Sequence, residues 1–334
     1  MFARMPAAGR RRPAGRRVCL PALVLAAVAA AGSSAAGSED GATGPRFEPP
    51  TRAEIRAETA EFERRYGASS RGASLQSASK APQSVLPQNR FVTFYGAPQL
   101  GATIIGRKSP NGAARKLRRQ ARPYASRSEK PIVRGFDIIA TIVTPCSGRR
   151  DKCRTHQSRS VLDRYLKEAR QMDGRLILDI QPGRASVKSE IGHWRSYLKK
   201  PDVDVAIDPE WNMGAGEEPG EDQGSIRAGE VNDASAQVQR LIDEENLPDK
   251  MLVVHQFRAG SIKNDSNVQQ RDGVDVVFNF DGIGSPGAKK AGYRNLHQSG
   301  IFDGFSLFYR LDNNLMSPGQ VMGLNPRPDY VMYQ

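Results

Sequence analysis

Histidine, cysteine and tryptophan are scarce in this chain of 334 residues, and their scarcity excludes several kinds of chemistry. None of the four histidines stands in the His-x-His or His-Glu-x-x-His spacing of a zinc site. No Gly-x-Ser-x-Gly motif is present to form the nucleophile elbow of a serine hydrolase. The sequence therefore predicts no metal site and no organic cofactor, although a Ca²⁺ bound by carboxylates stays an alternative.

Long hydrophobic runs are rare, and the clearest one lies near the N-terminus. Residues 18–31 form an apolar stretch that is short for a membrane span and has the length of a signal-peptide core. The stretch follows a cluster of arginines and precedes Ser34-Ala35-Ala36, a small-residue cleavage site. We predict that residues 1–36 are a signal peptide that uses Sec export or, through Arg16-Arg17, twin-arginine export. An uncleaved anchor is the alternative, and in either case the protein is secreted or associated with the cell surface.

Only three cysteines occur, and Cys19 lies in the predicted leader. Cys146 and Cys153 remain, separated by the polar run SGRRDK. An exported protein folds in an oxidising compartment, where two cysteines at this spacing are expected to pair. The sequence therefore predicts one disulfide that closes a short loop.

Acidic residues are nearly absent from one segment, which carries much of the net charge of +13. Residues 107–134 hold ten lysines and arginines against one glutamate. We predict that this segment contacts an anionic cell-wall polymer or a membrane surface. Nucleic acid is not an expected partner, because an exported protein rarely meets it. A solvated helix face is the alternative interpretation.

Composition divides the rest of the chain into two regions. Residues 37–88 are rich in Gly, Ser, Ala and Pro and are predicted to form a linker with one helical arm over residues 51–66. Thr51 and Glu54 give this helix a capping box, and Gly67 is expected to end it. Residues 89–334 are predicted to form one barrel domain.

Eight short apolar runs, most of them rich in Val, Ile or Phe, alternate with amphipathic stretches in this second region. Such runs are typical of strands buried on both faces, and strands that alternate with helices pair in parallel. The runs cover residues 91–96, 136–143, 175–180, 203–208, 251–257, 274–280, 302–309 and 329–333. Helices are predicted over 160–171 and 230–245, and a short one begins at Ser317-Pro318. The predicted fold class is α/β, a (β/α)8 TIM-like barrel with an N-terminal helical arm, and an open doubly wound sheet is the alternative.

Polar side chains gather at the C-terminal ends of these runs, where barrel active sites form. The fourth run ends in Asp208-Pro209-Glu210, and side chains two positions apart on a strand point the same way. Two neighbouring carboxyls raise the pKa of one of them, which makes it a proton donor near neutral pH. We predict that Glu210 is a general acid tuned by Asp208, and that Asp179 or Asp281 is the base or nucleophile that glycoside hydrolysis also requires.

Other polar or aromatic side chains near strand ends are expected to bind the substrate. These are Tyr95, Gln181, Trp211, Glu230, His255, Gln256, Asn279 and Tyr309. Structural alternatives exist for several of them, since Trp211 could be core, Glu230 could stabilise a helix start and His255 could be a structural histidine.

Several phrases at the strand ends resemble known proteins. LDIQPGR (178–184), DPEW (208–211), GEVN (229–232), LPDKMLVVHQF (247–257) and PDYVMYQ (328–334) resemble uncharacterised exported actinobacterial proteins with a glycoside-hydrolase-like TIM barrel. This resemblance covers residues 90–334 and implies the fold and export, not a reaction. The Asp-x-Glu of the fourth run also resembles the acid motif of chitinase-like glycosidase barrels, which implies Glu210 as the proton donor. The Asp-Gly-x-Asp that precedes this pair in those barrels is missing here.

Taken together, these features predict a secreted glycoside hydrolase-like protein that acts on an extracellular or cell-wall polysaccharide by carboxylate acid–base catalysis. A non-catalytic cell-wall or carbohydrate-binding barrel and a metal-dependent hydrolase are the alternatives.

Overall fold

The computed structural model describes residues 48–66, 85–86 and 88–334. The predicted leader (1–36), Gly67 and most of the linker lie outside the described residues. The helical arm is α1 (Arg52–Tyr66), as predicted, and its capping box is formed. The Thr51 N–H donates to Glu54 Oε2 at 2.8 Å, and the Glu54 N–H donates to Thr51 Oγ1 at 3.2 Å.

Eight parallel strands close into a barrel, which confirms the predicted (β/α)8 architecture. Each of the eight predicted runs contains one strand, and β1 closes the barrel by pairing with both β2 and β11. The strands are β1 (Arg90–Gly96), β2 (Ile132–Val143), β4 (Arg175–Ile180), β5 (Val203–Ile207), β7 (Lys250–Gln256), β9 (Val274–Phe280), β10 (Phe302–Leu307) and β11 (Tyr330–Tyr333). The open doubly wound sheet is excluded by this closure.

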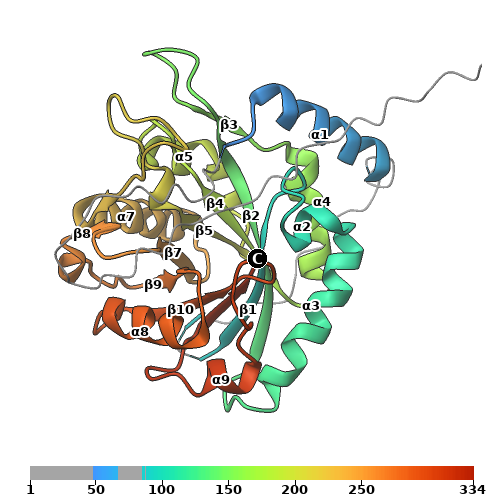
Figure 1. The fold of residues 1–334 in the computed structure, drawn as a ribbon, viewed down its shortest axis with the longest axis vertical. Helices are drawn as coiled ribbons and strands as arrows, with labels where there is room; N and C mark the ends of the chain where they lie inside the picture. Colours follow the sequence, from blue (N-terminus) through green and yellow to red (C-terminus); the bar gives the residue numbers. More distant parts are fainter. Residues whose placement is uncertain (1–47, 67–84, 87) are drawn as a thin grey trace, which may run out of the picture.

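Helices surround the strands on the outside of the barrel (Figure 1). They are α2 (Ile104–Arg107), α3 (Pro110–Ala125), α4 (Arg159–Arg170), α5 (Val187–His193), α6 (Arg195–Leu198), α7 (Ala228–Glu245), α8 (Pro286–Leu296) and α9 (Pro318–Met322). Short elements complete the fold: β3 (Arg154–His156), β6 (Ile226–Arg227), β8 (Ile262–Lys263) and the 3₁₀ helices Pro209–Trp211 and Asp265–Asn267. The helices predicted over 160–171 and 230–245 are α4 and α7.

Alternation along the strands separates two apolar cores. Side chains that point outward, such as Leu252 and Val254 on β7, pack with helix residues such as Leu117 in a large core. Side chains that point inward, such as Val253, fill the barrel in a second, smaller core. The direction of a strand residue therefore decides whether it reaches the barrel interior or the helices.

Cys146 and Cys153 form the predicted disulfide in the loop between β2 and β3. We expect its loss, by Cys146→Ser with Cys153→Ser, to lower the free energy of unfolding by about 2 kcal/mol, because the bridge closes a short loop and constrains the unfolded chain. Urea unfolding of the oxidised protein and of this double variant measures the difference. Indistinguishable unfolding curves for the two proteins would show that the bridge does not contribute.

Candidate active site

Three acidic residues and one histidine meet inside the barrel at the C-terminal ends of the strands, which we call the barrel mouth. Asp179 lies on β4, Asp208 follows β5, His255 lies on β7 and Asp281 follows β9. All four are buried, from 0% exposed for Asp179 to 8% for Asp281. Since strand alternation points each of them inward, residues far apart in sequence converge on one site.

His255 connects two of these carboxylates. Its Nδ1 lies 2.9 Å from Asp281 Oδ2, and its Nε2 lies 3.4 Å from Asp179 Oδ2. Because both oxygens contact the same small ring, they lie within roughly 9 Å of each other, a separation at which glycosidases place two carboxylates. The sequence prediction that Asp179 and Asp281 share one site therefore has a geometric basis.

The protonation of this cluster is strongly altered. Burial alone would lower the pKa of His255, but its contacts with Asp179 and Asp281 raise it well above the usual value. Burial raises the pKa of Asp179 and raises that of Asp208 well above its usual range, and neighbouring carboxylates add to both effects. The cluster thus holds protons that these acids would release in water at neutral pH.

Glu210 belongs to the same cluster, but it does not lie on the strand with Asp208 as predicted. Pro209–Trp211 forms a 3₁₀ helix, so the two-residue alternation of a strand stops at Asp208. Asp208 instead caps this turn, and its Oδ1 accepts the Glu210 N–H at 3.2 Å. Burial, then the charge of Asp281, raises the pKa of Glu210 to about 7, and the side chain is partly exposed. Glu210 is therefore a partly exposed residue whose carboxyl group titrates near neutral pH.

Asp137 on β2 is a further buried acid that the sequence analysis did not select. Its Oδ2 accepts the Tyr330 hydroxyl at 2.7 Å. Burial, then the charge of Asp179, raises the pKa of Asp137 to about 8. The available signal was an acid at an inward position of an apolar run, but Asp137 lies near the start of that run, away from the strand end where a barrel site is expected.

Charged residues occur at both ends of the barrel, in contrast to the predicted bias toward one end. At the N-terminal ends some are paired with cations: Arg175 Nε lies 2.6 Å from Asp204, and Lys130 Nζ lies 2.7 Å from Asp329. Asp275 on β9 instead accepts the Leu86 N–H at 2.7 Å, and burial raises its pKa to about 6. At the mouth, no lysine or arginine of the described residues lies within ion-pair distance of Asp179, Asp208 or Asp281. Three neighbouring acids without such a partner are a feature of a functional site.

Several buried polar atoms of this interior have no hydrogen-bond partner within the described part of the chain. They include Asp137 Oδ1, Asp179 Oδ1, Asn279 Oδ1 and Asp281 Oδ1, whereas Asp179 Oδ2 and His255 Nε2 face each other at 3.4 Å. Buried polar groups in folded proteins are nearly always paired, so a cluster of unpaired ones requires an explanation. A buried water molecule is one partner that could satisfy them.

Tyr95, Gln181 and Trp211 lie together on one side of the mouth. They line a small pocket of about 20 Å³, close to the volume that one water molecule needs, together with Pro50 of the arm. Gln181 is held by the Val143 N–H at 3.1 Å and donates to the Tyr95 hydroxyl at 3.4 Å. Tyr95 in turn lies 5.5 Å from the His255 ring, so this group adjoins the acidic cluster.

The arm lies over this side of the mouth and is held there by polar contacts. Arg52 forms an ion pair with Asp151 of the disulfide loop at 2.5 Å. Farther along α1, Glu63 accepts the Ser158 hydroxyl at 2.7 Å, and Ile55 is buried among residues of the barrel interior. The arm therefore forms part of the wall of the site.

Four predicted binding residues have other surroundings. Asn279 is inside the barrel and donates to Ser306 Oγ at 2.9 Å, whereas alternation directs Gln256 to the face opposite His255. Glu230 accepts the Arg227 N–H at 3.1 Å in the capping box of α7, which is the structural alternative. Tyr309 packs on Tyr333 in the large core between the strands and the helices, and its hydroxyl donates to Gln120 on α3 at 2.8 Å.

The structure therefore brings Asn279 into the barrel interior but does not bring Gln256, Glu230 or Tyr309 to the acidic cluster.

Among the described residues, no group of three or more His, Cys, Asp and Glu side chains is arranged to hold a metal ion. Within the same part of the chain, no helix is long and apolar enough to cross a membrane.

Comparison with known proteins gives little beyond this geometry. No protein-family model matches the chain, and no curated protein matches it. Among solved structures, the chain is similar to a GH18 chitinase from Pseudoalteromonas aurantia, with 11% sequence identity and a TM-score of 0.34. The match covers 73% of this chain and 93% of the chitinase chain. The chain is thus a TIM-barrel protein by its strand pairing, with an acidic cluster at the barrel mouth.

Proposed function

We propose that this protein is a glycoside hydrolase-like barrel that cleaves a polysaccharide by carboxylate acid–base catalysis. The observation that carries the proposal is Glu210, a partly exposed carboxyl at the mouth with a pKa raised to about 7. It lies in the same cluster as Asp208, Asp179 and Asp281, which supply the second carboxyl that glycoside hydrolysis needs.

In this proposal Glu210 donates its proton to the glycosidic oxygen as the bond to the leaving sugar breaks. Buried Asp208, next to Glu210, has a pKa raised well above its usual range and stays protonated, whereas burial and the charge of Asp281 keep the pKa of Glu210 high. Asp281 or Asp179 acts as nucleophile or as the base that activates water, and the positive charge on His255 stabilises its anionic form. Tyr95 and Trp211 are buried beside this cluster, so they shape the wall of the site and do not stack on a sugar ring.

We also propose that the protein works outside the cytoplasm, on an extracellular or cell-wall glycan, as the sequence predicts. The Cys146–Cys153 disulfide supports this location, because such bonds persist in oxidising compartments. Membership of an exported actinobacterial group remains a prediction from sequence resemblance.

The proposal predicts how activity depends on pH. A general acid must be protonated to work, so kcat/KM should fall about tenfold per pH unit once the pH rises above the pKa of Glu210 near 7. A pH–rate profile on a soluble polysaccharide measures this limb. A profile that stays flat from pH 6 to pH 9 would remove Glu210 as the acid.

A non-catalytic carbohydrate-binding barrel is the second candidate. The small pocket beside Tyr95 and the cover of Pro50 favour it, because a catalytic cleft has to admit a glycosidic bond. Glycan binding without any release of reducing ends would select this candidate over the enzyme.

A further inference from the structure

A cationic surface lies beside the barrel mouth, on the part of the chain with few acids. It consists of Arg107, Lys108, Lys116, Arg119 and Arg310, which we call the basic rim. Arg107 and Lys108 end α2, Lys116 and Arg119 lie in the middle of α3, and Arg310 follows β10. Helices α2 and α3 follow β1 in sequence, so the rim borders the C-terminal ends of β1 and β10.

The members of the basic rim lie close enough to repel one another. The pKa of Lys116 is lowered by its partial burial and then by the charges of Lys108, Arg119 and Arg107. The pKa of Arg107 is likewise lowered by its partial burial and then by the charge of Arg310. Lys116 Nζ also lies 4.6 Å above the ring of Tyr309, which holds this lysine in place.

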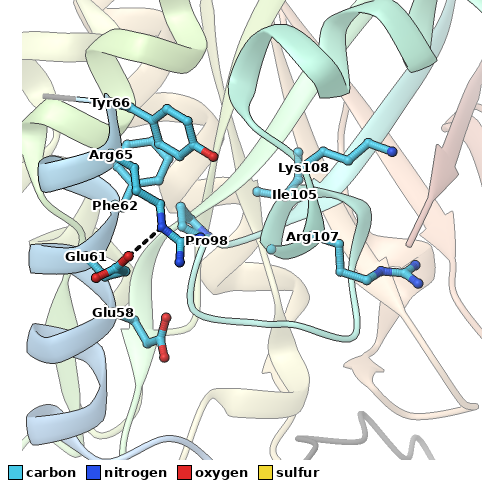
Figure 2. A pocket seen from close by; sticks show the side chains of 10 residues that line it. Glu58, Glu61, Phe62, Arg65, Tyr66, Pro98, Ile105, Arg107 and Lys108 are labelled. Carbon is cyan, nitrogen blue, oxygen red and sulfur yellow. Dashed lines mark hydrogen bonds and ion pairs between the residues drawn. The ribbon is translucent and has the colours of Figure 1, made fainter.

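No carboxylate of the described residues forms an ion pair with a member of the basic rim. The nearest acidic wall belongs to α1, across a groove that Glu58, Glu61 and Arg107 help to line. Figure 2 shows that Arg107 and Lys108 point away from α1, whereas Glu61 pairs with Arg65 on its own helix. The positive charge of the rim is thus available to a partner.

The chemistry of the rim favours a hydrophilic polyanion over a membrane. The apolar face of α3, including Leu117 and Tyr124, is buried against the barrel. Among the described residues, only Leu315 is an exposed large hydrophobic side chain. Firm attachment to a bilayer needs apolar side chains that enter it, and the rim has none, so charge alone would hold the rim to a membrane.

We infer that the basic rim binds an acidic polysaccharide with a carboxylate on its sugar units. Lys116 and Arg119, three residues apart on one helix, lie about 5–6 Å from each other at Cβ, so successive charged sugars could each meet a cation. The assignment to a polysaccharide, not another polyanion, rests on the proposed function, because a glycan that enters the mouth passes this rim.

Binding of fluorescent polygalacturonate to the purified full chain tests the inference, with its uncharged methyl ester as the matched polymer. We expect binding of the acid form only, with an affinity that weakens as salt is added. The variant Lys116→Glu/Arg119→Glu should weaken binding at least about tenfold. Lys290→Glu/Arg294→Glu, an exposed pair on α8, should leave it unchanged. The neutral variant Arg107→Gln/Arg119→Gln, with a thermal melt, separates lost binding from lost folding.

The inference would be overturned if the Lys116→Glu/Arg119→Glu and Lys290→Glu/Arg294→Glu variants lost the same affinity. It would also be overturned if the protein bound the methyl ester as tightly as polygalacturonate. Tighter binding of polyphosphate or DNA than of polygalacturonate would overturn the assignment to a polysaccharide. Glu210→Gln should bind polygalacturonate as the unmodified protein does. If the protein hydrolyses nothing while rim-dependent binding persists, the proposed catalysis fails and the binding surface stands.

Discussion

Replacing Glu210 with glutamine should lower kcat on a hydrolysed polysaccharide by roughly a hundredfold to ten-thousandfold, the usual contribution of a general acid. Glutamine keeps the size and most of the hydrogen bonding of the side chain but has no proton to donate to the leaving oxygen. The affinity for the glycan should change little, because Tyr95 and Trp211 remain in place. A screen for released reducing ends, followed by kinetics on the best substrate, measures the effect.

Glu244→Gln is the matched control for this substitution. Glu244 lies near the end of α7, where it pairs with Arg195 at 2.8 Å on the surface, and it has no contact with the mouth. Its substitution should leave kcat unchanged. If Glu210→Gln retained full activity, the general acid would have to be another residue, and the proposed mechanism would be wrong.

Replacing His255 with leucine should destabilise the fold by about 3–5 kcal/mol, the typical cost of removing one partner from a buried ion pair. Among the described residues, His255 is the only cationic side chain within ion-pair distance of Asp179 and Asp281. Without it, these acids must either remain as unpaired buried charges or take up protons. Urea unfolding at neutral pH measures the loss. Adding Asp179→Asn and Asp281→Asn to the leucine variant should restore part of the stability, because the unpaired charges are then removed.

His297→Leu provides the comparison, because His297 also contacts an aspartate, Asp303, at 2.9 Å. This pair is more exposed, with 34% of the histidine side chain accessible to solvent. Its loss should therefore lower the free energy of unfolding by no more than about 1 kcal/mol. Equal costs for the two histidine substitutions would show that His255 is a structural residue of no special electrostatic importance.

The fold could be predicted from sequence because a barrel strand leaves a strong local pattern. Each strand is buried on both faces, so short apolar runs between amphipathic helices identify all eight. The same pattern does not show the direction of a side chain at a strand end. Gln256, Tyr309 and His255 all lie at the ends of apolar runs. Only His255 points into the barrel, because it lies two residues after Val253, which fills the barrel interior.

The site was predicted in part because residue types at strand ends are visible in a sequence, whereas their partners are not. Asp204 lies on β5 and Asp208 follows that strand four residues later, but Asp204 is neutralised by Arg175, whereas no lysine or arginine pairs with Asp208 among the described residues. Which of these acids lies beside a cationic side chain depends on how the strands pair in the closed barrel. Asp137 was missed for the related reason that an inward acid in the middle of β2 reaches the cluster only through the register with β4.

The pKa of Glu210 tests the central claim most directly, because it requires no knowledge of the substrate. Carbon NMR of the side-chain carboxyl, assigned by comparison with Glu210→Gln, gives this value through a pH titration. The account predicts a midpoint near pH 7, caused by burial and by the neighbouring carboxylates. A midpoint near 4.5, the ordinary value of a glutamic acid, would show that Glu210 is an ionised surface carboxylate and that the mouth holds no proton donor of this kind.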